Sequence, residues 1–586
     1  MTVEDVAATM TSAVHPARAW WEPGGPLAAL RRAPTLGAAL ASRAQSEPGA
    51  VAYYLQDEPE GITVGELYEL AGRAASALVD RGVSPGDRVG VCLDTGRDLL
   101  ATIFGCQLAG AVPFLTEPAV LPSRRRAGAD RIRHMIRVAR PRAFVVDASL
   151  GELVGPVCAE HRVPMVTPPF TSAGWSRGPA ADPDELALIQ FTSGTTKAAR
   201  GVALTHRAAM ANIAAIGSRL RMRDGDLTVG WLPLHHDMGM IGILLSTFMH
   251  GVPVALLSPM SFALSPERWL RTISYFRGTI SAAPNFAYRL CATRLSDAAL
   301  KDLDLSSWRA ALNGAEVVDA PTVRAWQERM RPYGLHPRSM VPCYGMAEIG
   351  LAATFADPGS PVRTRRVDHG FLRASGRAVD AREGDVPVLE LVSCGPPLPG
   401  VEVRITGEDG RPLPGRTEGD IRLRTSSAMN GYYGDPEETR RVLGDGWLRT
   451  GDRGLLIDGE LYVTGRIKDL IIIGGRNYTP YEIEAAAADV APSGTVTAAV
   501  GCPDPDRGEA LVVLVEFRGQ VDDPAALRAA VVRSVSSRTG LTVQRVVLVR
   551  RGSLPKTSSG KLRRPEIVQS LIAGRLPDAF TEGPGE

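Results

Sequence analysis

The chain has 586 residues, which as a prior corresponds to about three or four domains. Hydrophobic residues make up 44% of it, as in ordinary globular proteins, and the net charge of +2 provides no general attraction to nucleic acid. The seven cysteines are scattered and form no CxxC pair, which favours a reducing compartment. We find neither a signal-peptide pattern nor an apolar run long enough to span a bilayer, so we expect a cytoplasmic protein.

Helix-like and strand-like patterns alternate from about residue 34 onwards. This alternation predicts an α/β fold with a largely parallel sheet. Between about 390 and 465, short strands stand between Gly/Pro turns, which predicts a β-rich subdomain. In chain order, the expected elements are strand 88–93, helix 98–109, and strands 111–115, 186–191, 401–405, 420–424, 470–473, 495–500, 511–517 and 545–548.

The domain organisation follows from these changes of pattern. We predict a large N-terminal domain, residues 1–467, built from parallel-sheet α/β subdomains and the β-rich subdomain. A small α/β C-terminal domain, residues 468–586, should follow, with a hinge near Lys468.

The segment 192–202, TSGTTKAARGV, directly follows an expected strand. Hydroxyls and backbone N–H groups in a tight loop can surround phosphate oxygens, and flanking cations offset their charge. On composition alone, such Ser/Thr/Gly loops are more often ordinary turns.

Four further segments contain residues suited to nucleotide chemistry. Tyr344 beside a glycine can stack on a base, and the carboxylate of Glu348 can hold Mg²⁺. Asp452, after a tight turn, can accept hydrogen bonds from ribose hydroxyls. A lysine on the Gly/Ser loop near the C-terminus can stabilise charge on a transferring phosphoryl group. Individually, each is equally explained as a turn or a solvated basic tail. The segments are PCYGMAE at 342–348, WLRTGD at 447–452, GRIKD at 465–469 and LPKTSSGK at 554–561.

Lysine is rare in this chain, because arginine stands at almost every basic position. An ammonium differs from a guanidinium in shape, hydration and pKa range, so retained lysines indicate positions that require one. The lysines are Lys197, Lys301, Lys468, Lys556 and Lys561, and all but Lys301 fall in the loop segments above.

Taken together and in order, these segments resemble the adenylate-forming superfamily of acyl-CoA ligases, peptide-synthetase adenylation domains and luciferases. The resemblance runs from about residue 35 to 570 and includes GYYGDPEET at 431–439. It implies ATP and Mg²⁺ as cofactors, and attack of a carboxylate on the ATP α-phosphate.

The resemblance also implies roles for individual residues. Lys561 matches the catalytic lysine, Glu348 the Mg²⁺ ligand and Lys468 the hinge of the mobile C-terminal domain. The implied nucleotide-binding residues are Thr192, Ser193, Gly194, Thr195, Thr196 and Lys197 around the phosphates, Asn313, Gly314, Ala315, Glu316, Tyr344, Gly345 and Met346 around adenine, and Asp452 and Arg466 on the ribose.

The phosphate loop departs from the family pattern. Lys197 stands where the family usually has glycine, and Ala199-Arg200 stand where it has Pro-Lys. We therefore expect the Lys197 ammonium to replace part of the backbone contact to the phosphates.

Other segments resemble one branch, the fatty acyl-AMP ligases, which transfer the acyl group to the phosphopantetheine thiol of an acyl carrier protein. These segments are WLPLHHDMG at 231–239, SAAPNFA at 281–287, VSCG at 392–395 and GGRN at 474–477. In this branch His236 would lie close to the substrate carboxylate, although a packed or capping histidine is the alternative. Trp231, Met238, Met240 and Ile241 are expected to line the acyl pocket, unless they are core.

The spacing from Glu348 to Gly395 is longer than expected for a CoA ligase, and the candidate insertion is roughly 358–388. In the acyl-AMP ligases an insertion here restrains the C-terminal domain and disfavours CoA, whereas the alternative is an ordinary surface loop. The arginine-rich segment 124–142 could dock an acidic carrier protein, but a solvated face is the simpler interpretation.

Two other functions stay open on the sequence. An acyl-CoA ligase shares the first half-reaction, and a catalytically inactive relative would only bind nucleotide or a carrier protein. The presence of Lys561, Glu348, Asp452 and Arg466 argues against the inactive relative.

Overall fold

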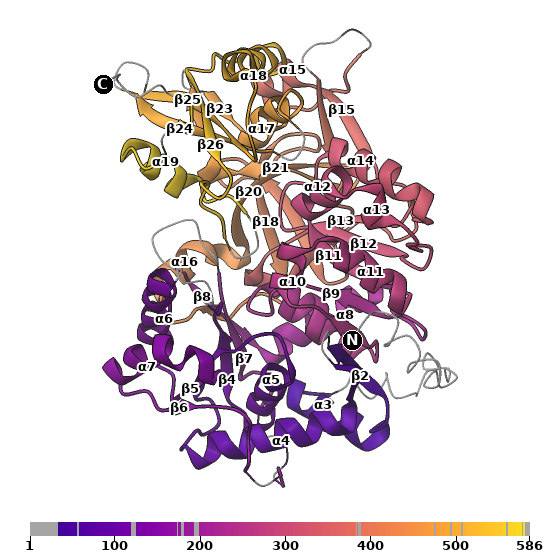
Figure 1. Cartoon of the computed structure of the whole chain (residues 1–586), viewed down its shortest axis with the longest axis vertical. Helices are drawn as coiled ribbons and strands as arrows, with labels where there is room; N and C mark the ends of the chain where they lie inside the picture. The colour runs from indigo at the N-terminus through magenta and orange to yellow at the C-terminus, as the bar shows by residue number, and fades with distance from the viewer. Residues whose placement is uncertain are drawn as a thin grey trace.

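The protein consists of two α/β units around parallel sheets, a β-rich part and a C-terminal α/β unit (Figure 1). The computed structural model describes residues 33–580 except 56–57, 119–124, 173, 177, 179–180, 193–198, 383, 385–387, 474–475, 493–494, 505–507, 558–560 and 577. Among these described residues, no helix is long and apolar enough to cross a membrane.

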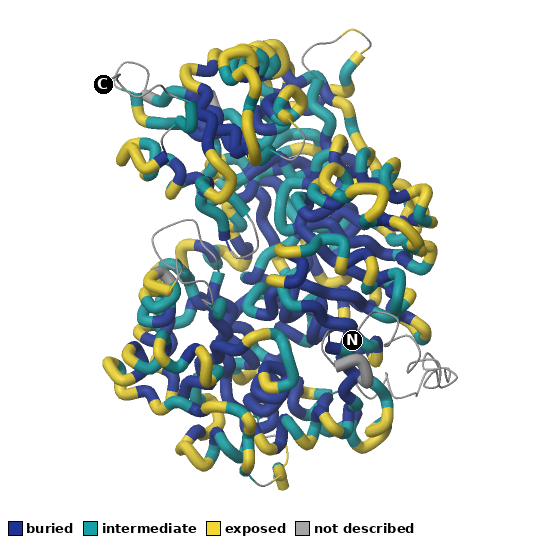
Figure 2. The backbone as a smooth tube through the Cα atoms, in the orientation of Figure 1, coloured by how far each residue is buried: buried dark blue, intermediate teal, exposed yellow. Residues whose placement is uncertain are grey.

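The largest sheet has eight strands in the order β14-β13-β12-β11-β9-β10-β1-β2, parallel except at its two edges. Its central strands are buried and apolar, as expected where helices cover both faces of a parallel sheet (Figure 2). The strands are β1 (Val51–Leu55), β2 (Glu58–Thr63), β9 (Thr228–Gly230), β10 (Val254–Leu256), β11 (Ile280–Pro284), β12 (Ala310–Gly314), β13 (Met340–Gly345) and β14 (Ala352–Phe355). The helices are α3 (Leu36–Ser46), α4 (Val64–Asp80), α8 (His206–Leu220), the π-helix η3 (Met238–Leu245), α9 (Ser246–Met249), α10 (Pro259–Leu264), α11 (Glu267–Phe276), α12 (Asn285–Arg294), α13 (Asp297–Leu300) and α14 (Ala320–Met330).

The second sheet, β4-β3-β5-β6, is wholly parallel, and the three-stranded sheet β19-β8-β7 lies beside it. Its elements are β3 (Arg88–Cys92), α5 (Arg97–Ala109), β4 (Val112–Leu115), α6 (Arg125–Ala139), β5 (Ala143–Val146), α7 (Gly151–Glu160) and β6 (Met165–Val166). The three-stranded sheet contains β7 (Leu186–Phe191), β8 (Gly201–Thr205) and β19 (Gly431–Tyr432), which is followed by α16 (Pro436–Val442).

The β-rich part is an antiparallel sheet, β17-β18-β20-β21, with a smaller pair, β15-β16. The strands are β15 (Thr364–Asp368), β16 (Val388–Val392), β17 (Val401–Thr406), β18 (Gly419–Thr425), β20 (Leu448–Ile457) and β21 (Glu460–Arg466), and helix α15 (His369–Ser375) follows β15. Within the stretch from 358 to 388, the described residues include strand β15 and helix α15, and β15 pairs with β16, so the stretch contains regular structure where the alternative was an ordinary surface loop.

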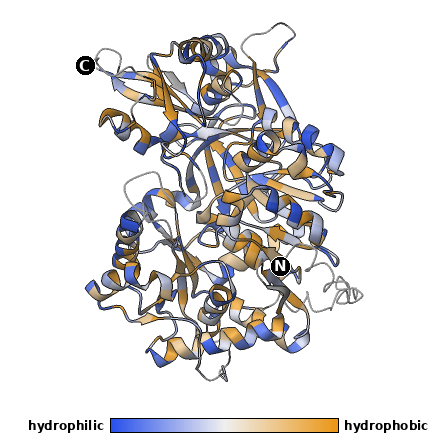
Figure 3. Cartoon of the chain, in the orientation of Figure 1, coloured by the Kyte–Doolittle hydropathy of each residue, from blue (hydrophilic) through white to orange (hydrophobic). Residues whose placement is uncertain are grey.

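The C-terminal unit packs helices on both faces of the sheet β24-β25-β26, with its own apolar clusters on either side (Figure 3). It comprises β22 (Ile471–Ile473), β23 (Arg476–Tyr478), α17 (Pro480–Ala488), β24 (Val496–Asp504), β25 (Gly508–Phe517), α18 (Pro524–Thr539), β26 (Arg545–Arg550) and α19 (Arg564–Ile572). The α/β fold class is confirmed, and each expected strand has a counterpart. The boundary at 467/468 stays a prediction.

Candidate active site

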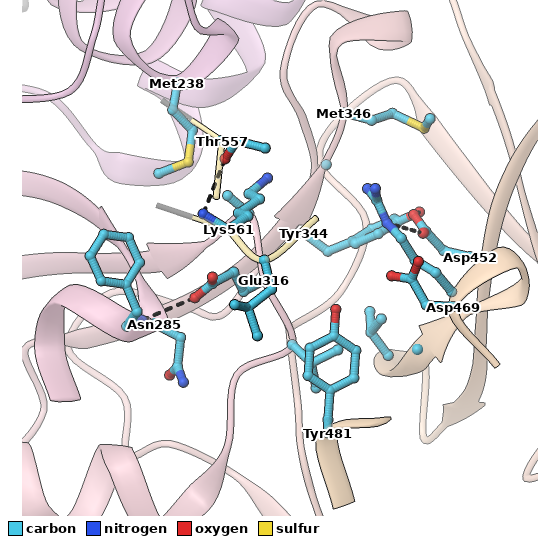
Figure 4. Close-up of a pocket in the computed structure, with 18 of the residues that line it drawn as sticks. Met238, Asn285, Glu316, Tyr344, Met346, Asp452, Asp469, Tyr481, Thr557 and Lys561 are labelled. Carbon is cyan, nitrogen blue, oxygen red and sulfur yellow. Dashed lines mark hydrogen bonds and ion pairs between the residues drawn. The ribbon is translucent and has the colours of Figure 1, made fainter. Parts of the chain in front are cut away.

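One large cavity of about 1440 Å³ lies between the carboxyl ends of the central strands, the β-rich sheet and the C-terminal unit. The carboxyl edge of a parallel sheet is where ligands usually bind in α/β proteins. The cavity is lined by residues from nearly every segment that the sequence singled out (Figure 4).

Tyr344, Asp452 and Arg466 form a hydrogen-bonded cluster on one wall. The Tyr344 hydroxyl donates to Asp452 Oδ2 at 2.8 Å, and Arg466 Nε lies 2.9 Å from Asp452 Oδ1. The three side chains come from β13, β20 and β21, so the antiparallel pairing of β20 with β21 places the ion pair directly. The cluster presents an aromatic ring and a fixed carboxylate to the cavity.

The turns after β12 and β13 shape the adjacent floor. Ala315 has a left-handed backbone with φ of 65°, which is costly for a residue other than glycine and typical of functional turns. At Gly345 a Cβ would lie 1.8 Å from the Leu351 carbonyl oxygen, so only glycine fits. Glu316 and Met346 also line the cavity, whereas the buried Asn313 and Gly314 lie beneath its surface.

Glu348 is a half-buried carboxylate on the cavity wall. The Tyr432 hydroxyl donates to its Oε1 at 2.8 Å. Burial raises the pKa of Glu348; the hydrogen bond from Tyr432 opposes this shift, while the charge of Asp237 adds to it. Two carboxylates acting on each other beside a cavity suit a cation, and Mg²⁺ usually takes one or two carboxylates plus phosphate oxygens.

His236 and Asp237 lie at the start of η3. Asp237 caps this helix by accepting from the Met238 N–H at 2.8 Å, and His236 Nδ1 lies 3.6 Å from Asp237 Oδ1. Burial alone would raise the pKa of Asp237, but bonding to His236 and the charge of Lys561 outweigh it and lower the pKa.

The Lys561 side chain enters the cavity from the C-terminal unit, opposite Glu316 and Met238 (Figure 4). Burial lowers the pKa of Lys561, and the Arg466 guanidinium lowers it further. The carboxylates of Asp237 and Glu316 act in the opposite direction. An ammonium among carboxylates and a guanidinium is placed to meet an anionic ligand.

The loop that carries Lys561 is fixed at its base by Glu516, a residue that is only 4% exposed. Glu516 Oε1 accepts from the backbone N–H groups of Gly552 and Leu554, both at 3.0 Å, and Oε2 lies 2.7 Å from Lys556 Nζ. Further along the loop, the backbone N–H of Lys561 donates to Thr557 Oγ1 at 3.1 Å. No sequence pattern pointed to Glu516, because its partners are distant along the chain.

The hinge candidate Lys468 lies in a short 3-10 turn, Ile467–Asp469, and also lines the cavity. Burial lowers the pKa of Lys468, and the charge of Arg466 adds to this shift. Beyond the turn, Arg564 Nη1 lies 3.5 Å from Asp469 Oδ2 and its Nη2 lies 2.8 Å from Glu484, which links the turn to α17 and α19.

The phosphate-loop residues Ser193, Gly194, Thr195, Thr196 and Lys197 lie outside the described residues, so their predicted role stays a prediction. Thr192, at the near end of the loop, lines the cavity and donates its N–H to the Arg200 carbonyl at 2.9 Å. At the far end, Arg200 pairs with Glu438 at 2.8 Å and lies over the Tyr432 ring.

The cavity has an apolar arm that runs between one face of the large sheet and the helices α8 and η3. We define the acyl arm by the lining residues Ile216, Leu220, Met222, Thr228, Gly242, Ile243, Ile280, Ala282, Leu312, Ala352 and Phe355. At Gly242 a Cβ would meet Leu351 Cδ2 at 2.9 Å, so the absence of a side chain keeps the arm open there.

Of the four predicted acyl-pocket residues, only Met238 lines the cavity. The other three pack into the core, where Trp231 stacks on Phe262 with ring centroids 3.7 Å apart and Met240 and Ile241 are buried. Their apolar character is explained by packing, which the sequence pattern could not distinguish from lining.

Helix α15 of the predicted insertion contacts the C-terminal unit. Arg373 donates from Nη2 to Glu482 and from Nη1 to the Thr539 carbonyl, both at 2.8 Å, and its guanidinium lies over the Tyr478 ring. His369 Nε2 lies 2.9 Å from Glu482 Oε2. We call these contacts the α15 latch.

The arginines of α6 are partly neutralised. Arg133 pairs with Asp130 at 2.7 Å and with Glu160 at 2.9 Å, and Arg131 pairs with Glu117 at 2.6 Å. These pairs agree with the interpretation of α6 as a solvated face.

The site therefore has the parts of a nucleotide-dependent enzyme that activates an acid, and the comparisons agree. The chain belongs to the AMP-binding enzyme family, whose model matches residues 40–433. It is 32% identical to the medium-chain-fatty-acid–acyl-carrier-protein ligase JamA of Moorena producens, over 89% of this chain and 91% of that protein. It is also 32% identical to the long-chain-fatty-acid–AMP ligase FadD26 of Mycobacterium tuberculosis, and this match covers 90% of this chain and 96% of that protein.

Two further comparisons bear on the branch. A solved structure from a study of the fatty acyl-adenylate ligases of E. coli and L. pneumophila has a TM-score of 0.84 at 33% identity, covering 93% of this chain and 99% of that one. A Caulobacter vibrioides protein, named provisionally as an acyl-CoA synthetase, is 36% identical, and this match covers 93% of this chain and 96% of that protein. The resemblance to fatty acyl-AMP ligases is confirmed.

Proposed function

We propose that the protein activates a fatty acid with ATP to an acyl-adenylate and then passes the acyl group to the phosphopantetheine thiol of an acyl carrier protein. The observation that carries this proposal is the Lys561 ammonium in a cavity whose walls combine the Tyr344–Asp452–Arg466 cluster with the acyl arm. One end suits a nucleotide and the other an aliphatic chain, with a cation between them.

In the first half-reaction, a carboxylate oxygen of the acid forms a bond to the α-phosphorus of ATP as the bond to the β-phosphate oxygen breaks, and pyrophosphate leaves. Lys561 contacts the attacking carboxylate and the α-phosphate, whose charge it offsets throughout. Tyr344 stacks on adenine, Asp452 accepts from the ribose hydroxyls, and His236 lies beside the acid.

Glu348 would hold Mg²⁺, with Asp237 near enough to contribute charge. When bound, the ion supplies neutralisation of phosphate charge. Glu348 is kept in place by Tyr432, so the carboxylate is oriented before the nucleotide arrives.

In the second half-reaction, the thiol sulfur forms a bond to the carbonyl carbon of the acyl-adenylate as the bond from that carbon to the AMP phosphate oxygen breaks. A thioester forms, AMP leaves, and the thiol proton passes to solvent. We propose that residues 468–586 turn about Lys468 between the two half-reactions. The α15 latch opposes this movement unless the carrier protein is present, which supports a carrier over CoA as the acceptor.

The buried thiols among the seven free cysteines suit a reducing cytoplasm.

The test is mass spectrometry of reactions with ATP, Mg²⁺ and a panel of fatty acids, each with and without CoA. We expect acyl-AMP in both conditions and little or no acyl-CoA. Ready formation of acyl-CoA would identify a CoA ligase instead, and no adenylate from any acid would contradict the proposal altogether.

A second measurement tests the latch. Arg373→Ala removes two charge-assisted hydrogen bonds and a ring contact between α15 and the C-terminal unit, so we expect the ratio of acyl-CoA to acyl-AMP to rise about tenfold. Arg377→Ala, an exposed position two residues beyond α15, is the matched control and should leave the ratio unchanged. An unaltered product ratio in Arg373→Ala would show that the latch does not govern the choice of acceptor.

A further inference from the structure

The acyl arm spans the height of the large sheet. It begins at the carboxyl ends of β11 to β13, beside His236 and Glu348, and its lining reaches Thr228 and Ile280, which pair with each other at the amino ends of β9 and β11. Because β11 has five residues and a strand rises about 3.3 Å per residue, the arm is on the order of 15 Å long.

The wall of the arm is apolar except at its far end. Ile280 and Ala282 of β11 lie on the same face as Leu312 of β12, which is the register partner of Ala282. Opposite them, Leu220 and Ile243 come from α8 and η3. Thr228 is the one residue of the acyl arm that carries a side-chain oxygen or nitrogen.

The Thr228 hydroxyl is an unexplained polar group. Its residue is 0% exposed, and no hydrogen-bond partner for Oγ1 exists among the described residues. Leaving a buried hydroxyl unpaired is unfavourable, and a valine of nearly the same shape would avoid that cost.

The polar groups nearest along the chain do not serve Thr228. Asp226 accepts from the Thr279 hydroxyl at 2.8 Å and pairs with Arg309, which also donates to the Leu220 carbonyl at 2.9 Å. The members of this network hydrogen-bond to one another and to the Leu220 carbonyl, and none of them bonds to Thr228, which lines the far end of the arm.

We propose that the acid carries a hydroxyl or keto oxygen at or near the far end of its chain, and that Thr228 hydrogen-bonds to this oxygen. The inference rests on the proposed function and specifies its substrate class as a terminally oxygenated fatty acid. An acid that ends in a plain methyl group would leave the Thr228 hydroxyl unpaired in the complex. The enzyme should therefore prefer the oxygenated acid, which forms this hydrogen bond, over the plain acid, which cannot.

The experiment compares plain and ω-hydroxy acids of matched length, from octanoic to hexadecanoic, by kcat/KM for adenylate formation. With the wild-type enzyme, the ω-hydroxy acid should be favoured about tenfold at one chain length, where its oxygen reaches Thr228. In Thr228→Val the preference should collapse to about unity at that length.

Thr354→Val is the matched control. The Thr354 hydroxyl is also buried without a partner among the described residues, but Thr354 does not line the cavity. This variant should keep the wild-type preference. Equal kcat/KM for plain and hydroxy acids at every length, or a preference that survives in Thr228→Val, would overturn the inference while plain acids still give adenylate. Absence of adenylate from both kinds of acid would instead overturn the proposed function.

Discussion

Replacing Lys561 with alanine is expected to reduce adenylate formation about 100- to 1,000-fold, the usual effect of removing one preorganised group that stabilises transition-state charge. The ammonium lies in the cavity, and its loop is fixed through Thr557 and Glu516. Pyrophosphate release under saturating ATP and acid measures the effect. Lys301→Ala, an exposed position away from the cavity, should behave as wild type.

The same lysine gives the reaction an alkaline limit. Only the ammonium form offsets phosphate charge, and burial together with Arg466 lowers the pKa of Lys561. The rate should therefore be constant while Lys561 is protonated and fall as pH rises through this lowered pKa, below the range of an ordinary lysine. Lys561→Ala should lack that limb. Near wild-type pyrophosphate release in Lys561→Ala would remove this residue from the mechanism.

Asp452→Ala is expected to lower kcat/KM for ATP about 10- to 100-fold, mainly through KM, because the proposed contact to the ribose would be lost in both ground and transition states. It should also lower the free energy of unfolding by about 2 kcal/mol, since the buried Tyr344 hydroxyl loses its acceptor and Arg466 its partner. Initial rates over an ATP series and urea unfolding measure the two effects.

Asp409→Ala is the control for this variant, because Asp409 lies in an exposed turn of the β-rich sheet. It should change neither KM for ATP nor the unfolding midpoint. A wild-type KM for ATP in Asp452→Ala would show that Asp452 supports the fold without contacting the nucleotide.

The sequence predicted the strands well because buried parallel strands are short apolar runs between turn residues. The strand expected at 186–191 is β7 at the same bounds, and the one at 401–405 is β17 with one more residue. The sequence did not reveal which apolar side chains pack in the core and which line the cavity. Trp231 and Ile241 are apolar for packing, while Ile216 and Phe355, which line the acyl arm, had no distinguishing pattern.

Residues that act through distant partners were also beyond the sequence. Tyr432 bonds to Glu348 across 84 positions, and Glu516 accepts from Gly552, which is 36 positions further along the chain. Such pairs are set by tertiary packing, and a single sequence records no spacing for them. For Asp237, the segment WLPLHHDMG was a usable signal, because it places an acidic residue directly after His236.

Gly242 has a consequence for how this enzyme can diverge. The width of the acyl arm at Gly242 depends on the absence of a Cβ, because a Cβ there would contact the end of the flexible Leu351 side chain. A single-nucleotide change from a glycine to an alanine codon would therefore narrow the passage without touching Lys561, Glu348 or the Tyr344–Asp452–Arg466 cluster. Descendants of this gene can thus acquire new acyl preferences in small heritable steps, while the chemistry of adenylation is inherited intact.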